Sequence, residues 1–250
     1  MVILVTNDDG VYAPGILTLA GALGEMGRVI VAAPDRERSA ASHSLTLHYP
    51  LRIEEIEKDR YAIDGTPTDC VHLAVHVILG GSKPDLLVSG INRGGNLGQD
   101  ITYSGTVWAA LEGSLMGIPS MAVSLVDDKF SDYRPAASFA AWMAGWVRDN
   151  GLPEGTVLNI NVPDNPDQDL DRFVITHQGY HRFAESVIRN LDPRGRSYYW
   201  IGGQKLPSKG GLETDVGAVA AGFISVTPLH ADMTNHKAME KLRDLRGKMP

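Results

Sequence analysis

Apolar residues in the first 163 positions form two alternating kinds of segment. Short runs without regular polar alternation, many of them β-branched, predict strands buried on both faces at residues 2–6, 28–34, 84–90, 119–125 and 156–163. Apolar residues at helical spacing predict helices at residues 14–26, 68–80, 106–117 and 135–150. This alternation predicts an α/β fold, in which a mostly parallel sheet carries helices on both faces.

The last third of the chain has a different pattern. Polar, turn-rich stretches surround strand-like segments at residues 170–215, which we interpret as a β-hairpin excursion that serves as an oligomerisation arm. Residues 215–232 return to a short helix and a strand, and a basic helix is predicted at residues 235–247. We therefore expect residues 1–250 to form one α/β domain with its core at residues 1–166 and 215–232.

Polar segments directly follow three of the predicted strands. They are NDDG at residues 7–10, PDRERSAAS at residues 34–42 and SGINRGGNLGQDITYSGT at residues 89–106. Ligand sites of parallel α/β folds lie at the carboxyl ends of the strands. We therefore expect the three segments to meet at one edge of the sheet.

Composition and charge narrow the classes of function. The chain is 43% hydrophobic and 21% charged, which is typical of a globular protein with a substantial core. Its net charge of −7 argues against a general nucleic-acid-binding protein, although small anionic substrates remain compatible with it. No apolar run approaches the roughly 20 residues of a membrane-spanning helix. We expect neither duplex nucleic acid nor a membrane as a partner.

A single cysteine, Cys70, excludes an intramolecular disulfide and fits a reducing compartment. We interpret Cys70 as a small buried residue early in a helix. The first residues form a strand-like run without the basic region and cleavage site of a signal peptide, so we expect no targeting segment there.

Asp8 and Asp9 are adjacent carboxylates at the end of the first predicted strand. One interpretation is a polar turn in which an aspartate caps the next helix. The other is a site for a hard divalent cation, which prefers carboxylate oxygens and would relieve the repulsion between the two groups. Adjacent side chains of an extended strand point in opposite directions, so a shared ion requires a turn at this pair.

The glycine-rich segment at residues 89–106 is the most informative. It runs into a predicted helix, so Ser104, Gly105 and Thr106 lie at a helix N-terminus, where free N–H groups favour phosphate. Asn92 and Asn96 add amide groups. The segment matches neither the P-loop nor the dinucleotide-binding pattern, and a flexible loop before a capped helix is the alternative interpretation.

The serine-rich loop and the histidines give weaker signals. Ser39 and Ser42 offer hydroxyl groups on what is otherwise an ordinary surface loop. We interpret His72 and His76 as residues of a helix face rather than as zinc ligands.

His230 and Asp232 follow the strand-like run at residues 224–229, so we expect them near the same edge of the sheet as the polar segments. There they are candidate proton donors to a leaving alkoxide, with a loop cap as the alternative.

Several motifs together resemble the survival protein SurE family, the metal-dependent 5′/3′-nucleotidases. They are TNDDGVYAPGI, VAAPDRERSAASHSLTL, GTPTDCV, PDLLVSGINRGGNLGQDITYSGTVWAALEG and TDVGAVAAGFISVTPL, and they extend to about residue 232. The resemblance implies a Rossmann-like, doubly wound core and one Mg²⁺ or Mn²⁺ ion per subunit. It also implies hydrolysis of nucleoside monophosphates and short polyphosphate, a cytoplasmic location, and homodimers or homotetramers formed through C-terminal extensions.

The resemblance also implies roles for single residues. The family's metal ligands fall on Asp8, Asp9, Ser39 and Asn92. Its phosphate-binding positions fall on Asn96, Ser104, Gly105 and Thr106, and Ser42 belongs to the same pocket. Trp108 is bulky at a position where similar sequences often carry a small residue, which we expect to alter the packing behind the site but not the ligands.

We interpret the chain as a phosphomonoesterase that forms no covalent enzyme intermediate. Asp8 and Asp9 are the candidate catalytic residues, and Asp8 is the preferred candidate for orienting or deprotonating the attacking water. The alternative is a non-catalytic module that senses nucleotide or polyphosphate. Such a sensor needs the helix N-terminus but has little need for two adjacent acids.

Overall fold

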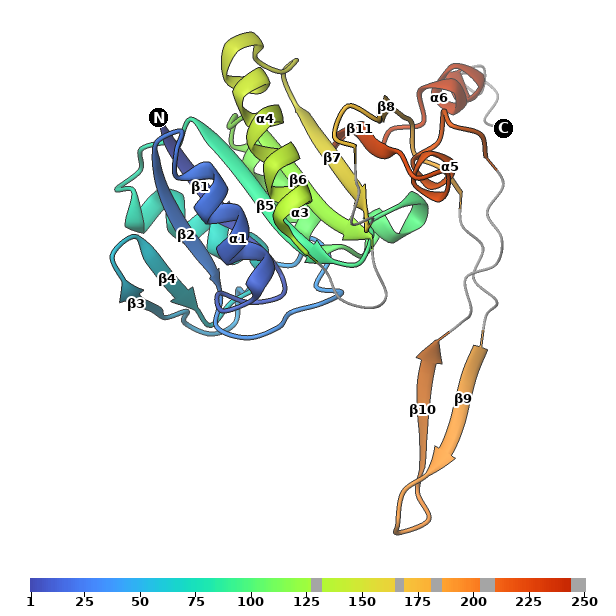
Figure 1. The fold of residues 1–250 in the computed structure, drawn as a ribbon. Helices are drawn as coiled ribbons and strands as arrows, with labels where there is room; N and C mark the ends of the chain where they lie inside the picture. Colours follow the sequence, from blue (N-terminus) through green and yellow to red (C-terminus); the bar gives the residue numbers. More distant parts are fainter. Residues whose placement is uncertain (127–131, 165–168, 181–185, 203–209, 244–250) are drawn as a thin grey trace.

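A computed structural model describes residues 1–126, 132–164, 169–180, 186–202 and 210–243 (Figure 1). Its strands are β1 Val2–Thr6, β2 Arg28–Pro34, β3 Ile53–Glu57, β4 Arg60–Ile63, β5 Leu86–Arg93, β6 Ser120–Val126, β7 Thr156–Pro163, β8 Phe173–Ile175, β9 Ser186–Leu191, β10 Ser197–Gly202 and β11 Ile224–His230. Its helices are α1 Pro14–Leu23, α2 Pro67–Leu73, the π-helix η1 Ala74–Ile78, the 3₁₀-helix η2 Gly98–Thr102, α3 Gly105–Leu115, α4 Arg134–Asn150, α5 Asp215–Ala220 and α6 His236–Arg243. None of these helices is long and apolar enough to cross a membrane.

The main sheet has nine strands in the order β3-β4-β2-β1-β5-β6-β7-β11-β8. The six strands from β4 to β7 in this order run parallel to one another. At the two ends of the sheet, β3 is antiparallel to β4, and β11 is antiparallel to β7. The predicted α/β fold with a mostly parallel sheet is therefore confirmed.

Helices cover both faces of this sheet (Figure 1). One apolar core joins α1 and α4 to the sheet and includes the fully buried Ile16 and Phe139. The other joins α2, η1 and α3 to the opposite face and includes Cys70 and Val107. The burial of Cys70 early in α2 agrees with its predicted place. Two layers of helices thus hold the central parallel strands rigidly, so the loops at the strand ends begin from fixed points.

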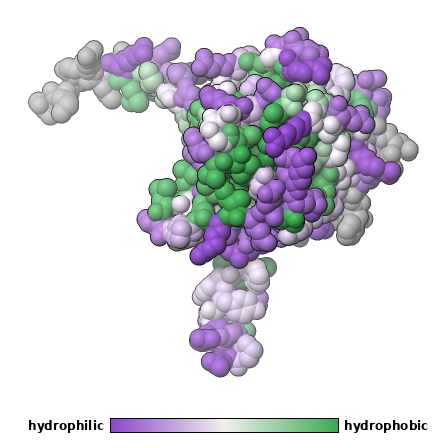
Figure 2. Space-filling view, turned by 90° about the vertical axis from the view of Figure 1, so that its left-hand side faces the viewer, coloured by the Kyte–Doolittle hydropathy of each residue, from purple (hydrophilic) through white to green (hydrophobic). Residues whose placement is uncertain are grey.

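The hairpin β9–β10 lies apart from the main sheet and projects from the body as a two-stranded ribbon (Figure 1). Figure 2 views the molecule from the side of β3 and β4, and the hairpin again protrudes below the body. Apolar side chains gather in the middle of the face that this view shows. Phe173–Ile175, near the start of the segment expected to form the arm, pairs with β11 in the main sheet instead.

Gly15 lies where α1 crosses the end of β5. A Cβ atom at Gly15 would collide with the backbone carbonyl oxygen of Ile91, which cannot move aside as a flexible side chain can. Gly21 lies on the same helix, and a Cβ there would meet nothing within 4 Å. Both glycines therefore have a helical backbone, but only Gly15 is packed too closely to accept a side chain.

This difference predicts opposite effects of the same substitution. We expect Gly15→Ala to lower the free energy of unfolding by about 1–3 kcal/mol, because overpacking forces the helix away from the sheet. We expect Gly21→Ala to raise it by about 0.5–1 kcal/mol, because alanine favours the helix. Urea unfolding followed by circular dichroism measures both, and equal effects of the two substitutions would contradict the packing argument.

Candidate active site

The three polar segments meet at the carboxyl ends of the parallel strands, as predicted. The backbone N–H of Arg38, after β2, donates to the carbonyl oxygen of Asp8, after β1, at 2.7 Å. The N–H of Arg93, at the end of β5, donates to Asp9 Oδ2 at 3.1 Å. Thr106, in the first turn of α3, donates its hydroxyl to Asp8 Oδ1. Asp8 and Asp9 thus lie where the three segments join.

The turn that the adjacent aspartates require is present. The side chain of Asn7 closes it, because Asn7 Oδ1 accepts from the Gly10 N–H and Asn7 Nδ2 donates to the Gly10 carbonyl, both at 3.1 Å. Gly10 adopts a φ of 104°, which other residues rarely adopt. The bend turns one carboxylate toward α3 and the other toward β5.

Asp8 is only 4% exposed, and its burial raises its pKa above the usual range. Hydrogen bonds from Thr106 and from the backbone at Gly105 oppose this rise. A Cβ atom at Gly105 would lie 3.0 Å from both Cβ and Oδ2 of Asp8, so glycine allows the start of α3 to approach the carboxylate closely. The N-terminus of α3 therefore lies directly against the buried carboxyl group of Asp8.

Asp9 is partly buried, and its pKa is raised to about 6. Loss of hydration is the largest cause and the charge of Asp8 is the second, while the hydrogen bond from Arg93 acts in the opposite direction. Two neighbouring acids that are both costly to ionise form an environment that favours a cation.

A pocket of about 490 Å³ opens beside this pair, and Asp9 and Ser39 both line it. Ser39 donates its hydroxyl to Glu37 Oε1 at 2.7 Å. Asn92 donates Nδ2 to the Gly94 carbonyl at 2.7 Å, so its amide oxygen is the ligand atom that it can offer. Asp8, Asp9, Ser39 and Asn92 remain predicted ligands.

Glu37 is a residue that sequence analysis did not single out. It lines the same pocket as Asp9, and its charge contributes to the raised pKa of that residue. No signal in its surface-like loop distinguishes Glu37 from a solvated acid.

Within the described ranges, no group of three or more histidine, cysteine, aspartate or glutamate residues has the arrangement of a metal site. The predicted set differs from such clusters because it combines two acids with a hydroxyl and an amide.

The first turn of α3 supplies the candidate phosphate site. Ser104 caps this helix, because its Oγ accepts from the Val107 N–H at 3.1 Å. Gly105 and Thr106 follow, and the N–H groups of a first helical turn have no partner within the helix. The roles of Ser104, Gly105 and Thr106 in binding phosphate stay predictions.

Asn96 belongs to a buried polar network between the glycine-rich loop and two strands. Its Nδ2 donates to Ser124 Oγ on β6 at 2.8 Å, and its backbone N–H donates to Asn161 Oδ1 on β7 at 2.8 Å. Asn159 Nδ2 donates to the Asn96 carbonyl at 2.9 Å. The network fixes the loop, and the predicted contact of Asn96 with phosphate stays a prediction.

Ser42 packs against the connection between η2 and α3. Its Oγ donates to the Thr102 carbonyl at 2.8 Å and its N–H donates to the Tyr103 carbonyl at 3.2 Å. The loop that carries Ser39 therefore lies against the helix end that carries the candidate phosphate site. Contact between Ser42 and phosphate is likewise a prediction.

The expectation for His230 and Asp232 is wrong. Because β11 runs antiparallel to β7, His230 pairs with Thr156, the first residue of β7. It therefore lies at the amino ends of the parallel strands, opposite to the edge with Asp8. Asp232 accepts from the Thr234 N–H at 2.8 Å, and its Oδ2 lies 2.8 Å from His236 Nε2. Neither residue is placed to protonate a leaving group.

Comparisons with known proteins agree with this geometry. The family model described as "Survival protein SurE" matches residues 3–185. The chain is 57% identical to the 5′-nucleotidase SurE of Geobacter sulfurreducens, over 97% of this chain and 93% of that protein. It is 54% identical to the 5′-nucleotidase SurE of Geotalea uraniireducens, over 97% and 98% of the two chains. Among solved structures, the SurE protein from Aquifex aeolicus has a TM-score of 0.87 and 43% identity, over 98% of this chain and 100% of that one. The chain therefore belongs to the survival protein SurE family.

Proposed function

We propose that this chain is a metal-dependent phosphomonoesterase that hydrolyses nucleoside 5′- and 3′-monophosphates to nucleoside and phosphate, and also acts on short polyphosphate. The observation that carries the proposal is the pair of poorly hydrated carboxyl groups, Asp8 and Asp9, beside the N-terminus of α3. The names of the relatives, 5′-nucleotidase SurE, support the nucleotide as substrate.

One divalent ion, Mg²⁺ or Mn²⁺, fits the donor set of this site. Burial and mutual repulsion raise the pKa of both aspartates, so a cation would stabilise their ionised forms. Asp8, Asp9, Ser39 and Asn92 would hold it through oxygen atoms, which such ions prefer. When bound, the ion supplies polarisation of a phosphoryl oxygen and a lowered pKa of water.

The chain's own groups orient the substrate and move the proton. In the structure the backbone N–H groups of Gly105 and Thr106 are directed at the Asp8 carboxylate. When a cation engages that carboxylate, the same N–H groups would bind phosphoryl oxygens and stabilise the charge that develops on them. Asp8 orients the attacking water and accepts its proton. Ser104 holds the helix end as its cap. Asn96 and Ser42 remain candidates for contact with the phosphate.

The rival function is a sensor that binds a nucleotide or polyphosphate without hydrolysing it. Both functions use the N-terminus of α3. Only hydrolysis has a use for the buried Asp8, whose ionisation is costly. The carboxylate pair therefore favours the enzyme.

An assay of phosphate release from AMP and GMP with Mn²⁺ tests the proposal. We expect release that a chelator abolishes, and we expect Asp8→Asn to lower kcat about 10²- to 10⁴-fold because the proton acceptor is lost. Asp149→Asn, on the exposed surface of α4, is the matched control and should keep the wild-type rate. Circular dichroism checks that both variants fold.

Two outcomes of this assay would contradict the proposal. Nucleotide binding without chelator-sensitive release identifies the sensor instead. A phosphorylated aspartate trapped during turnover contradicts hydrolysis without a covalent intermediate.

Thermal unfolding tests the ion site without an activity assay. At a metal concentration of 100 times Kd, binding should stabilise the wild type by about 2.7 kcal/mol, and Asp9→Asn should lose most of this gain. Without metal, we expect Asp9→Asn to be at least as stable as the wild type, because the amide removes a charge that burial and Asp8 disfavour. A metal-free variant with a clearly lower melting temperature would contradict this account of Asp9.

We further propose that the chain forms a homodimer or homotetramer through the hairpin β9–β10. An isolated two-stranded hairpin is marginally stable in water. The hairpin also exposes large apolar side chains, including Ile188 at 53%, Trp200 at 64% and Ile201 at 93%. Exposed apolar surface of this kind marks contact with another protein. Contact between copies of the chain would cover it.

The double substitution Trp200→Ser and Ile201→Ser tests this assembly. We expect the variant to show a smaller molar mass than the wild type in light scattering after size-exclusion chromatography. Val77→Ser, which removes an apolar side chain that is 58% exposed on the body, is the matched control. An unchanged mass of the double variant would exclude the hairpin as the interface.

We propose the cytoplasm as the compartment. The thiol of Cys70 is free and buried, and burial raises its pKa well above the usual range, so it is unreactive. A free thiol is compatible with a reducing environment. The proposed partners are small nucleotides and further copies of this chain, with neither duplex nucleic acid nor a membrane among them.

A further inference from the structure

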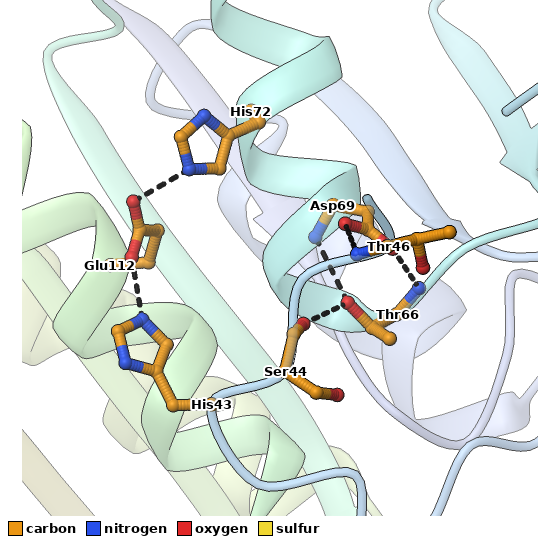
Figure 3. Close-up of polar contacts among 7 residues, drawn as sticks. All are labelled: His43, Ser44, Thr46, Thr66, Asp69, His72 and Glu112. Atoms are coloured by element: carbon orange, nitrogen blue, oxygen red, sulfur yellow. Dashed lines mark hydrogen bonds and ion pairs between the residues drawn. The ribbon is translucent and has the colours of Figure 1, made fainter. Parts of the chain in front are cut away.

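Glu112, on α3, is a buried acid outside the candidate metal set. It is 7% exposed, and each of its carboxylate oxygens meets an imidazole. Oε2 lies 2.6 Å from His43 Nε2, and Oε1 lies 2.8 Å from His72 Nε2 (Figure 3). A buried carboxylate is costly unless it is paired, so the two imidazoles compensate for its burial.

The two histidines come from different parts of the chain. His72 belongs to α2, whereas His43 belongs to the loop after β2, which also carries Ser39 and Ser42. The carboxylate of Glu112 therefore joins α3 to α2 on one side and to this loop on the other (Figure 3). Of its two bonds, only the bond to His43 restrains the loop directly.

The imidazole of His43 is held by a second contact. It stacks on the indole of Trp108, with ring centroids 4.7 Å apart and an angle of 15° between the planes. Trp108 Nε1 donates to the Thr102 carbonyl at 3.2 Å, and Ser42 Oγ donates to the same carbonyl at 2.8 Å. The bulky residue at position 108 thus serves as a platform for His43, close to the start of α3.

The far side of the loop is fixed separately. The Thr46 N–H donates to Asp69 Oδ1 at 2.9 Å, and Thr66 Oγ1 donates to the Ser44 carbonyl at 2.7 Å (Figure 3). Asp69 also completes the capping box at the start of α2 with Thr66. These bonds hold residues 44–46. Residues 39–42 are held instead by His43 and by the two bonds of Ser42 to the carbonyls of Thr102 and Tyr103.

Residues 39–42 need such restraint. Ala40 and Ser42 adopt φ angles of 57° and 52°, in the left-handed region that is unfavourable for residues other than glycine. Such conformations persist where the surrounding structure holds them. Ser39 lies directly beside Ala40 and lines the pocket with Asp9. Its position therefore depends on contacts made by neighbouring residues of the loop.

We propose that Glu112 is a positioning residue that, through His43, holds residues 39–42 so that Ser39 stays beside Asp9. This inference rests on the proposed function, because it takes Ser39 as a metal ligand. Glu112 follows Thr106 by six positions, which is about 9 Å along the helix, so it acts through His43 rather than on the substrate.

The two histidines provide a matched pair of variants. His43→Ala removes the bond between Glu112 and the loop, and His72→Ala removes the other bond of the same carboxylate. Glu112→Ala removes both bonds. Glu112→Gln keeps both, because an amide accepts from one imidazole and donates to the other. Isothermal titration with Mn²⁺ gives the metal affinity, and hydrogen exchange of residues 39–45 in the metal-free protein reports the restraint on the loop.

We expect His43→Ala and Glu112→Ala to raise the Kd for Mn²⁺ about tenfold, whereas His72→Ala and Glu112→Gln should stay within about twofold of the wild type. Amide exchange at residues 39–45 should be faster in the first two variants only. At saturating Mn²⁺, we expect KM for AMP to rise more than kcat falls, because the ion and Asp8 remain in place.

The outcomes separate this inference from the proposed function. If the wild type binds Mn²⁺ and releases phosphate but His43→Ala behaves as His72→Ala does, the positioning role is wrong and the proposed function stands. A lower melting temperature of Glu112→Ala with unchanged metal affinity and exchange also overturns it, since the role is then structural alone. If the wild type neither binds Mn²⁺ nor releases phosphate, the proposed function fails, and the role assigned to Ser39 fails with it.

Discussion

The site is organised by the close approach of two carboxyl groups in a poorly hydrated place. Asp8 and Asp9 cannot separate, because they are neighbours in the chain and the side chain of Asn7 closes their turn. Gly105 lets the start of α3 approach Asp8, and the backbone of β5 binds Asp9. Each contact makes the two acids less free to move apart, so their repulsion persists in the folded chain. A site of this kind retains an electrostatic cost that a bound cation would remove.

Parallel strands explain why the sequence was informative about this site. Their carboxyl ends lie at one edge, so a polar segment after each predicted strand is enough to predict that Asp8, Ser39 and Asn92 lie near one another. The same reasoning fails for His230. The apolar run at residues 224–229 predicts a strand, but nothing in a short apolar run indicates its direction, and β11 enters the sheet antiparallel to β7.

Polar contacts between residues far apart in the chain were the second feature that could not be predicted from the sequence. The apolar surroundings of His72 indicate a helix face, and the acid that it meets, Glu112, lies forty positions later on α3. In the same way, nothing in the sequence of β7 indicates that Asn159 and Asn161 hydrogen-bond to Asn96 of the glycine-rich loop, more than sixty positions earlier in the chain. Periodicity indicates which side of an element is buried, whereas the choice of a polar partner depends on how the helices pack across the sheet.

The balance of charge at the site determines how the proposed enzyme would attract a phosphate ester. A net charge of −7 would repel a phosphate ester, and two carboxylates at the site would add to this repulsion. A divalent cation against two carboxylates leaves no net charge, so the attraction for phosphate depends on oriented N–H groups rather than on the ion alone. The cap from Ser104 and the hydrogen bond from Thr106 to Asp8 help to fix the N-terminus of α3 beside the two acids. Glu112 lies on the same helix and contacts His43 of the loop that carries Ser39, so the proposed phosphate and metal sides of the site are both connected to α3.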